Sequence, residues 1–178
     1  MSDKENYDFS YRYETKLLKL PIKSNEFRAL MIQVDGAKTI DLSAGTAKIE
    51  ELLLNNCGEL EEIKWPKSPL AIKSLKIAGA LSLKHLDLSA MPYLEELSII
   101  NCPELASISN VDKQLKLLNL QGVKISTLDV AKAKDSLEIF NVITNIENFN
   151  IDLSHFNCLS TLEMLANSGQ FIILNSSK

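Results

Sequence analysis

Residues 49–57 read Ile-Glu-Glu-Leu-Leu-Leu-Asn-Asn-Cys, and residues 94–102 read Leu-Glu-Glu-Leu-Ser-Ile-Ile-Asn-Cys. In both stretches apolar side chains stand at positions 0, 3 and 5, counted from the first residue, and a cysteine stands at position 8. The Leu-x-Leu alternation at positions 3 and 5 is typical of a short strand whose alternate side chains face inward. The two stretches therefore predict a strand-forming unit that is repeated along the chain.

The same pattern recurs about every 22 residues, in units that we call rungs. Seven rungs begin at Phe27, Ile49, Ile72, Leu94, Leu115, Leu137 and Leu159. Their inward residues at positions 3 and 5 are Leu30 and Ile32, Leu52 and Leu54, Leu75 and Ile77, Leu97 and Ile99, Leu118 and Leu120, Phe140 and Val142, and Leu162 and Met164. One rung cannot bury its leucines alone, so we expect the strands to stack in parallel as a solenoid.

A second and weaker copy of the pattern lies halfway through the rungs. It reads Leu-Asp-Leu-Ser at residues 86–89 and Ile-Asp-Leu-Ser at residues 40–43 and 151–154. Related copies lie at residues 63–65 and 128–131, and Ile108, Phe171 and Ile173 fill the remaining places. This series predicts a second extended face on the solenoid.

The sequence resembles the leucine-rich repeat family, whose pattern Leu-x-x-Leu-x-Leu-x-x-Asn/Cys matches residues 49–57 and 94–102. The resemblance covers residues 27–174, although Ala80, Val123 and Asn145 replace the Asn/Cys of the pattern. The Leu-Asp-Leu-Ser element is similar to that of bacterial cell-surface members such as internalins. The resemblance implies an α/β-type leucine-rich repeat solenoid, strand-dominated, and a role in adhesion and protein binding. The alternative architecture is a flattened, right-handed β-solenoid with two sheets.

The domain organisation expected is an N-terminal cap over residues 1–26, the repeat domain over residues 27–174 and a polar tail over residues 175–178. The 178 residues are enough for one domain with its own core. The first residues, Met-Ser-Asp-Lys-Glu-Asn, resemble the segment behind the lipid-bearing cysteine of bacterial lipoproteins. We therefore expect a cell-surface or extracellular protein if a signal peptide and lipid anchor belong to the precursor, and a cytoplasmic one otherwise.

Composition argues against several function classes. The net charge is -4 and no basic cluster is interleaved with aromatic residues, so nucleic acid is not the expected partner. No apolar run is long enough for a membrane span. The six glycines form no nucleotide-binding motif, and neither the histidines nor the three cysteines have metal-ligand spacing. We expect no cofactor and no metal.

The cysteines have structural positions in the repeat. Cys57 and Cys102 stand at position 8 of their rungs. The resemblance to leucine-rich repeats implies that the chain turns inward there and that a small side chain bonds the loop backbone. Two rungs separate them, about 10 Å, which is too far for a disulfide. Cys158 lies elsewhere in its repeat. Buried structural thiols are the prediction for the two repeat cysteines.

Two polar columns on the second face have a chemical interpretation and a structural one. Glu62, His85 and Ser107 occupy equivalent outward positions of consecutive rungs, with Lys64, Asp87 and Ser109 beside them. They resemble a Ser/His/acid arrangement, but an open face without a pocket favours a solvated polar column. The aspartates Asp41, Asp87, Asp129 and Asp152, one in each rung, provide too few oxygen ligands for calcium and indicate turns. We predict a protein without enzymatic activity.

The outward positions of the first face give the candidate binding surface. From the fourth rung onward they include apolar residues that would form a contiguous patch if they are exposed together, with three amides inside it. The candidate partner-binding residues are Ile100, Leu117, Asn119, Gln121, Ile139, Asn141, Ile143 and Leu165. A one-residue shift in register would turn them inward. The predicted function is binding of a protein partner, at the cell surface or, alternatively, as an intracellular inhibitor or assembly partner.

Overall fold

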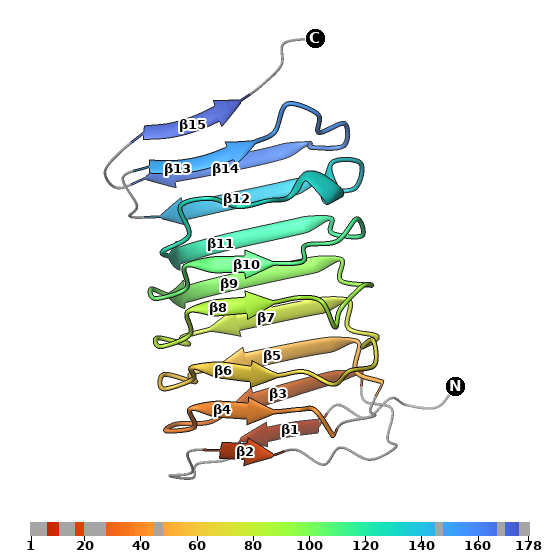
Figure 1. Ribbon diagram of the computed structural model, residues 1–178, viewed down its shortest axis with the longest axis vertical. Coiled ribbons are helices and arrows are strands. Elements are labelled where there is room, and N and C mark those ends of the chain that lie inside the picture. Colours follow the sequence, from red (N-terminus) through yellow and green to blue (C-terminus); the bar gives the residue numbers. More distant parts are fainter. Residues whose placement is uncertain are drawn as a thin grey trace.

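The protein winds into a parallel β-solenoid (Figure 1). The computed structural model describes residues 7–10, 17–19, 28–44, 48–144, 148–166 and 170–174. Its large sheet has the strand order β1-β3-β5-β7-β9-β11-β12-β14, with every neighbouring pair parallel. The strands are β1 (Tyr7–Ser10), β3 (Ala29–Gln33), β5 (Glu51–Asn55), β7 (Ser74–Ala78), β9 (Glu96–Cys102), β11 (Leu117–Val123), β12 (Ile139–Thr144) and β14 (Thr161–Ala166). The predicted strand-dominated parallel solenoid is thereby confirmed, with about six turns between β3 and β14.

The opposite side of the solenoid is built from three small parallel sheets, whose strands have three or five residues. They are β2 (Leu17–Lys19), β4 (Thr39–Asp41) and β6 (Glu62–Lys64), then β8 (His85–Asp87) and β10 (Ser107–Ser109), then β13 (Asn148–Asp152) and β15 (Gln170–Leu174). In the part of the chain that the structure describes, the sole helical element is the 3₁₀ turn η1 (Ala131–Ala133). The helical half of an α/β-type repeat is therefore not seen, and strands occupy its place.

The short strands follow from the half-repeat itself. In the second rung-half the inward Ile40 and Leu42 are buried on either side of Asp41, which is the period of a strand and not of a helix. Because repeats of 20–29 residues can combine a strand with a helix, the alternating burial, and not the length of the rung, favours a strand here. Only the copy at Leu128 departs from this rule, because η1 follows it in place of a longer strand.

The core consists of columns of equivalent residues, one from each rung. The strands pair so that Leu52 faces Leu75, Leu75 faces Leu97, and Leu97 faces Leu118. These four side chains are at most 1% exposed, as are Leu54, Ile77, Ile99 and Leu120 of the parallel column. The last rung differs, because Leu162 faces Phe140 in the same column but is 41% exposed.

A left-handed residue lies at the end of the strand in four consecutive rungs, directly after β5 and β7 and one residue before the last of β9 and β11. Asn56, Gly79, Asn101 and Gly122, all at position 7, have positive φ angles of 52°, 70°, 55° and 61°. Asparagine and glycine are the residue types that adopt this conformation at least cost. The bend turns position 8 inward, and the four side chains there are buried: Cys57, Ala80, Cys102 and Val123.

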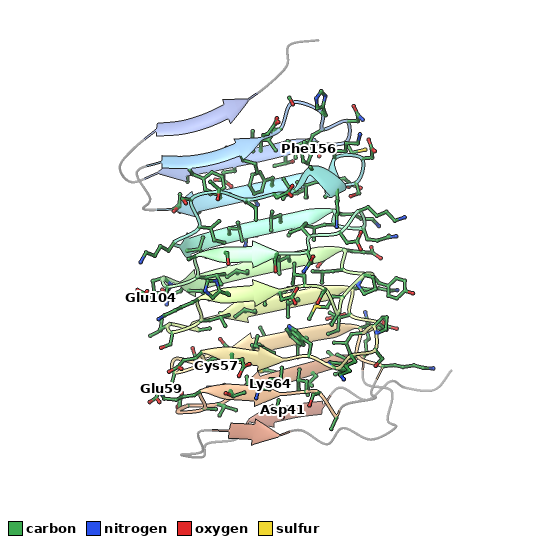
Figure 2. All side chains as sticks on the ribbon, in the orientation of Figure 1. Asp41, Cys57, Glu59, Lys64, Glu104 and Phe156 are labelled. Atoms are coloured by element: carbon green, nitrogen blue, oxygen red, sulfur yellow. The ribbon has the colours of Figure 1, made fainter. Side chains whose placement is uncertain are left out.

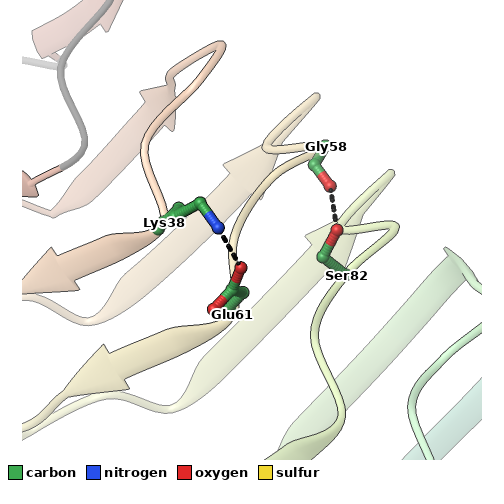
Figure 3. A network of polar contacts seen from close by, with 4 residues as sticks. All are labelled: Lys38, Gly58, Glu61 and Ser82. Atoms are coloured by element: carbon green, nitrogen blue, oxygen red, sulfur yellow. Dashed lines mark hydrogen bonds and ion pairs between the residues drawn. The ribbon is translucent and has the colours of Figure 1, made fainter.

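Polar contacts between neighbouring rungs hold the bends in register. The Lys38 ammonium lies 2.6 Å from the Glu61 carboxylate, and the Ser82 hydroxyl donates to the Gly58 carbonyl at 3.0 Å (Figure 3). The partners lie 23 and 24 residues apart, about one rung. Such exposed contacts add little stability individually, but they repeat along the stack.

The N-terminal segment adds a rung to the stack. Strand β1 pairs with β3, with Tyr7 facing Leu30 and Phe9 facing Ile32, and β2 pairs with β4. The predicted cap over residues 1–26 thus contains strands that lengthen both sides of the solenoid. The polar tail at residues 175–178, the rung start Phe27 and the variant position Asn145 lie outside the described residues.

Candidate interaction surface

The outward face of the large sheet carries three columns of side chains, one for each outward position of a rung. Over strands β9, β11, β12 and β14 the register aligns these residues side by side. The columns run Glu96, Leu117, Ile139 and Thr161; Ser98, Asn119, Asn141 and Glu163; and Ile100, Gln121, Ile143 and Leu165. All eight residues predicted to bind a partner belong to these columns.

Apolar side chains take five of the eight places in the two outer columns. Ile100 is 39% exposed and Leu165 is 51% exposed, which makes them two of the most exposed large apolar residues among those described. Leu117, Ile139 and Ile143 are partly buried. Large apolar groups in such numbers on one sheet face are typical of an interaction site.

Amides lie between and within the two outer columns, at Asn119, Asn141 and Gln121. The Asn119 amide donates to the Ser98 hydroxyl at 3.0 Å, and the Gln121 amide donates to Oδ1 of Asn119 at 3.0 Å. Next to them, Oδ1 of Asn141 is enclosed without a hydrogen-bond partner. The face therefore combines two apolar strips with a fixed polar centre.

The N-terminal half of the same face has a different character. Its outward positions include Glu51 and Lys76, which are exposed, and the polar Ser74. Arg28 lies 3.6 Å from Glu51. Met31 and Leu53 are the large outward apolar residues of this half, and both are partly buried, so such residues are fewer here than over the C-terminal half of the sheet.

The Ser/His column on the second face is partly assembled. His85 pairs in register with Ser107, and its Nδ1 lies 2.7 Å from the serine hydroxyl. Glu62 lies 3.7 Å from Lys64 and belongs to a different small sheet. Asp87 accepts hydrogen bonds from the backbone and hydroxyl of Ser89 and from the side chains of Ser109 and Asn110. His85 and Ser107 are both exposed, and the Glu62 and Asp87 carboxylates contact groups other than the imidazole.

The repeated aspartates close turns. In each Asp-x-Ser or Asp-x-Ala element the Asp side chain accepts a hydrogen bond from the backbone N–H two residues later, at 2.9 to 3.0 Å. The aspartates are Asp41, Asp87, Asp129 and Asp152. This Asx turn ends the short strand and reverses the chain into the next bend. The turn therefore explains why an aspartate recurs at the same place in these four rungs.

The cysteines differ in accessibility. All three are free, with Cys57 and Cys102 buried and Cys158 exposed. The Cys57 thiol points to the carbonyls of Asn55 and Ile32, at 3.5 and 3.8 Å, and burial raises the pKa of both repeat cysteines. The two buried thiols are therefore poor nucleophiles.

A small pocket of about 120 Å³ was not predicted from the sequence. It lies beside η1, with Leu128, Val130 and Phe156 as its apolar lining and Lys134 and His155 among its polar residues. The pocket depends on the 3₁₀ turn, which replaces a strand in that rung alone. A repeat pattern predicts the features that all rungs share. It therefore could not predict a 3₁₀ turn and a pocket that belong to one rung.

Comparisons with known proteins add no family, since no family model, no curated protein and no solved structure matches the chain. Within the described ranges, no group of three or more His, Cys, Asp and Glu side chains is placed to hold a metal ion. No helix in those ranges has the length and apolarity to cross a membrane.

Proposed function

We propose that this protein is a non-enzymatic binding module that holds a protein partner on the outward face of strands β9, β11, β12 and β14. The observation that carries the proposal is the pair of apolar strips over these strands, with Ile100 and Leu165 at 39% and 51% exposure. Water contact of large apolar groups is unfavourable by about 25 cal/mol per Å², so covering them with a partner is favourable.

The polar centre supplies specificity in this proposal. Asn119 is held by Ser98 and Gln121, so a partner meets a preorganised amide instead of a mobile one. The enclosed acceptor of Asn141 has a desolvation cost that a donor from the partner can offset. A partner with apolar side chains on both sides of a hydrogen-bond donor matches the three columns.

The resemblance to bacterial cell-surface leucine-rich repeat proteins supports adhesion as the setting for this binding. Labelling of intact source cells with a membrane-impermeant reagent tests that setting. Labelled protein on intact cells supports a surface location, whereas labelling only after lysis supports the inhibitor or assembly role instead.

We do not propose catalysis at His85. A general base needs a second group that orients its imidazole and a site that excludes water. Here Ser107 and His85 are both exposed, and Asp87 serves the turn at Ser89 and the contact to Asn110. The 2.7 Å contact fits a polar column between neighbouring rungs.

The binding test compares two double variants at equivalent positions of different rungs. Ile139→Lys with Ile143→Lys places charges in the apolar strips, and Ala29→Lys with Gln33→Lys places them at the same two positions of the first rung. Both pairs are outward, partly buried and on strands of one sheet. Circular dichroism and urea unfolding establish that each variant is folded.

Capture of a partner from the source cells should be lost in the Ile139/Ile143 variant and kept in the Ala29/Gln33 variant. Equal capture by both variants and the native protein would exclude this face as the binding surface. Loss of capture in both variants, with the fold intact, would indicate that the binding site extends over the whole sheet face.

A further inference from the structure

A column of alternating charge runs along the starts of the large-sheet strands, at position 1 of six consecutive rungs. From the second rung onward, the N–H of each member donates to the carbonyl of the member one rung earlier, at 2.7 to 3.3 Å. The members are Arg28, Glu50, Lys73, Glu95, Lys116 and Glu138. Cations and carboxylates therefore alternate from each rung to the next, and the uncharged Ser160 follows the last carboxylate.

The charges in this column interact with the rungs on both sides. The Lys116 ammonium lies 2.8 Å from Oε2 of Glu95. This contact lowers the pKa of Glu95, and Lys73 on the other side adds to the shift. The same contact raises the pKa of Lys116, and Glu138 on its other side adds to that shift. The column is therefore more than one isolated ion pair.

The apolar core does not distinguish one rung from another. It has the same residue type, at most 1% exposed, in four consecutive rungs, at Leu52, Leu75, Leu97 and Leu118. A strand that skipped a rung would meet an equivalent apolar surface. At position 1 it would meet a like charge instead, with Glu50 beside Glu95 or Lys73 beside Lys116. Like charges directly opposite each other on neighbouring strands are destabilising.

We propose that the position-1 charges act as one column that couples each rung to both of its neighbours and disfavours pairing between next-but-one rungs. Two other positions alternate with the same period. Position 7 reads Asn56, Gly79, Asn101 and Gly122, and the cysteines at position 8 belong to the second and fourth rungs. Exposed ion pairs contribute little one by one, but charges in a network contribute together.

A double reversal distinguishes the column from an isolated ion pair. Glu95→Lys with Lys116→Glu keeps the net charge of the protein and an opposite pair at positions 95 and 116. It also sets like charges beside Lys73 and Glu138. An isolated pair would leave the urea midpoint unchanged, whereas the column predicts a midpoint lower by about 0.5 M. An unchanged midpoint would overturn the proposal.

Glu138→Lys should change the sign of its effect with the background. In the native protein it places a cation beside Lys116 and should lower the urea midpoint. In the double variant it removes a repulsion and should raise the midpoint, although the change in net charge is the same. An effect of one direction in both backgrounds would overturn the proposal. So would a reversal of direction that is undiminished in about 1 M NaCl, where charges are screened beyond about 3 Å.

A milder series gives the same test if the reversals impair folding. Glu138→Gln should lower the urea midpoint in the native protein, because Lys116 loses the carboxylate on one side. In a Lys116→Glu background it should raise the midpoint, because it removes one of two neighbouring carboxylates. Equal effects in both backgrounds would contradict the column.

Cys57 and Cys102 can report pairing between next-but-one rungs. They stand at position 8 of the second and fourth rungs. In the native stack they are about 10 Å apart by strand spacing, too far for a disulfide. If the third rung were skipped during folding, they would be neighbours about 4.8 Å apart, which is within disulfide reach.

Refolding from urea in a glutathione redox buffer, in a Cys158→Ser background, traps such pairing as a Cys57–Cys102 disulfide. Glu95→Lys makes the skipped pairing attractive toward Glu50, so linkage should rise about threefold over the parent. Glu138→Lys changes the net charge equally but leaves positions 50 and 95 alike, so its linkage should match the parent. Equal linkage in Glu95→Lys and the parent, or an equal rise in Glu138→Lys, would overturn the proposal.

Discussion

Leucine-to-alanine changes at two positions of one core column should have unequal costs. Leu97 is completely buried between Leu75 and Leu118, so Leu97→Ala removes three carbons from a closed site and leaves a cavity. Such changes cost about 3 kcal/mol. Leu162 occupies the equivalent position in the last rung but is 41% exposed. Leu162→Ala loses less transfer energy and opens no closed cavity, so its expected cost is about 1 kcal/mol.

Urea unfolding followed by circular dichroism measures both costs, with Leu97 and Leu162 replaced one at a time. Equal losses of unfolding free energy, or a larger loss at Leu162, would refute the view that burial along the stack controls stability. A changed dependence on urea in the Leu162 variant would show separate unfolding of the last rung.

Three further results are expected. Asp87→Asn should weaken the turn and make the free energy of unfolding less sensitive to acid, because the hydrogen bond from Asn110 lowers the pKa of Asp87. In the native protein, the stability that the Asp87 carboxylate contributes is present above about pH 4 and is lost as the pH falls through the folded pKa. A pH series of urea unfolding curves that coincides for variant and native protein would contradict this. Gly79→Ala should cost about 1 kcal/mol because φ is 70°, whereas Gly79→Asn should cost less, since Asn56 holds the same conformation one rung earlier; equal thermal midpoints for both variants would exclude strain at this bend. A thiol reagent should modify Cys158 alone in the folded protein and all three cysteines after denaturation, and rapid native modification of more than one would show that the repeat thiols are accessible.

The sequence predicted the strands of the large sheet because each rung repeats the previous one. An inward residue such as Leu75 lies between equivalent residues of the neighbouring rungs, so the spacing of apolar residues also gives the pairing. The four bends at position 7 could have been found in the same way, since Asn56 and Gly79 alternate there with Asn101 and Gly122.

Features that belong to one place in the stack were less predictable. The exposure of Leu162 is an end effect, and its position in the repeat is the same as that of the buried Leu97. The 3₁₀ turn and the pocket beside His155 depend on one irregular rung. The 2.7 Å contact of His85 with Ser107 followed from their equivalent positions, but the bonds of Asp87 depend on side-chain rotamers that a repeat pattern does not contain.

The assignment of an outward face depends on the register of β11 and β12, because a slip of one residue would exchange inward and outward side chains. Leu117 lies directly opposite Ile139 in the structure. In a Cys158→Ser background, Leu117→Cys with Ile139→Cys should therefore form a disulfide under mild oxidation, since adjacent strands lie about 4.8 Å apart. Leu117→Cys with Glu138→Cys should remain reduced under the same conditions. Disulfide formation in the second pair and not in the first would contradict the register, and with it the proposed binding surface.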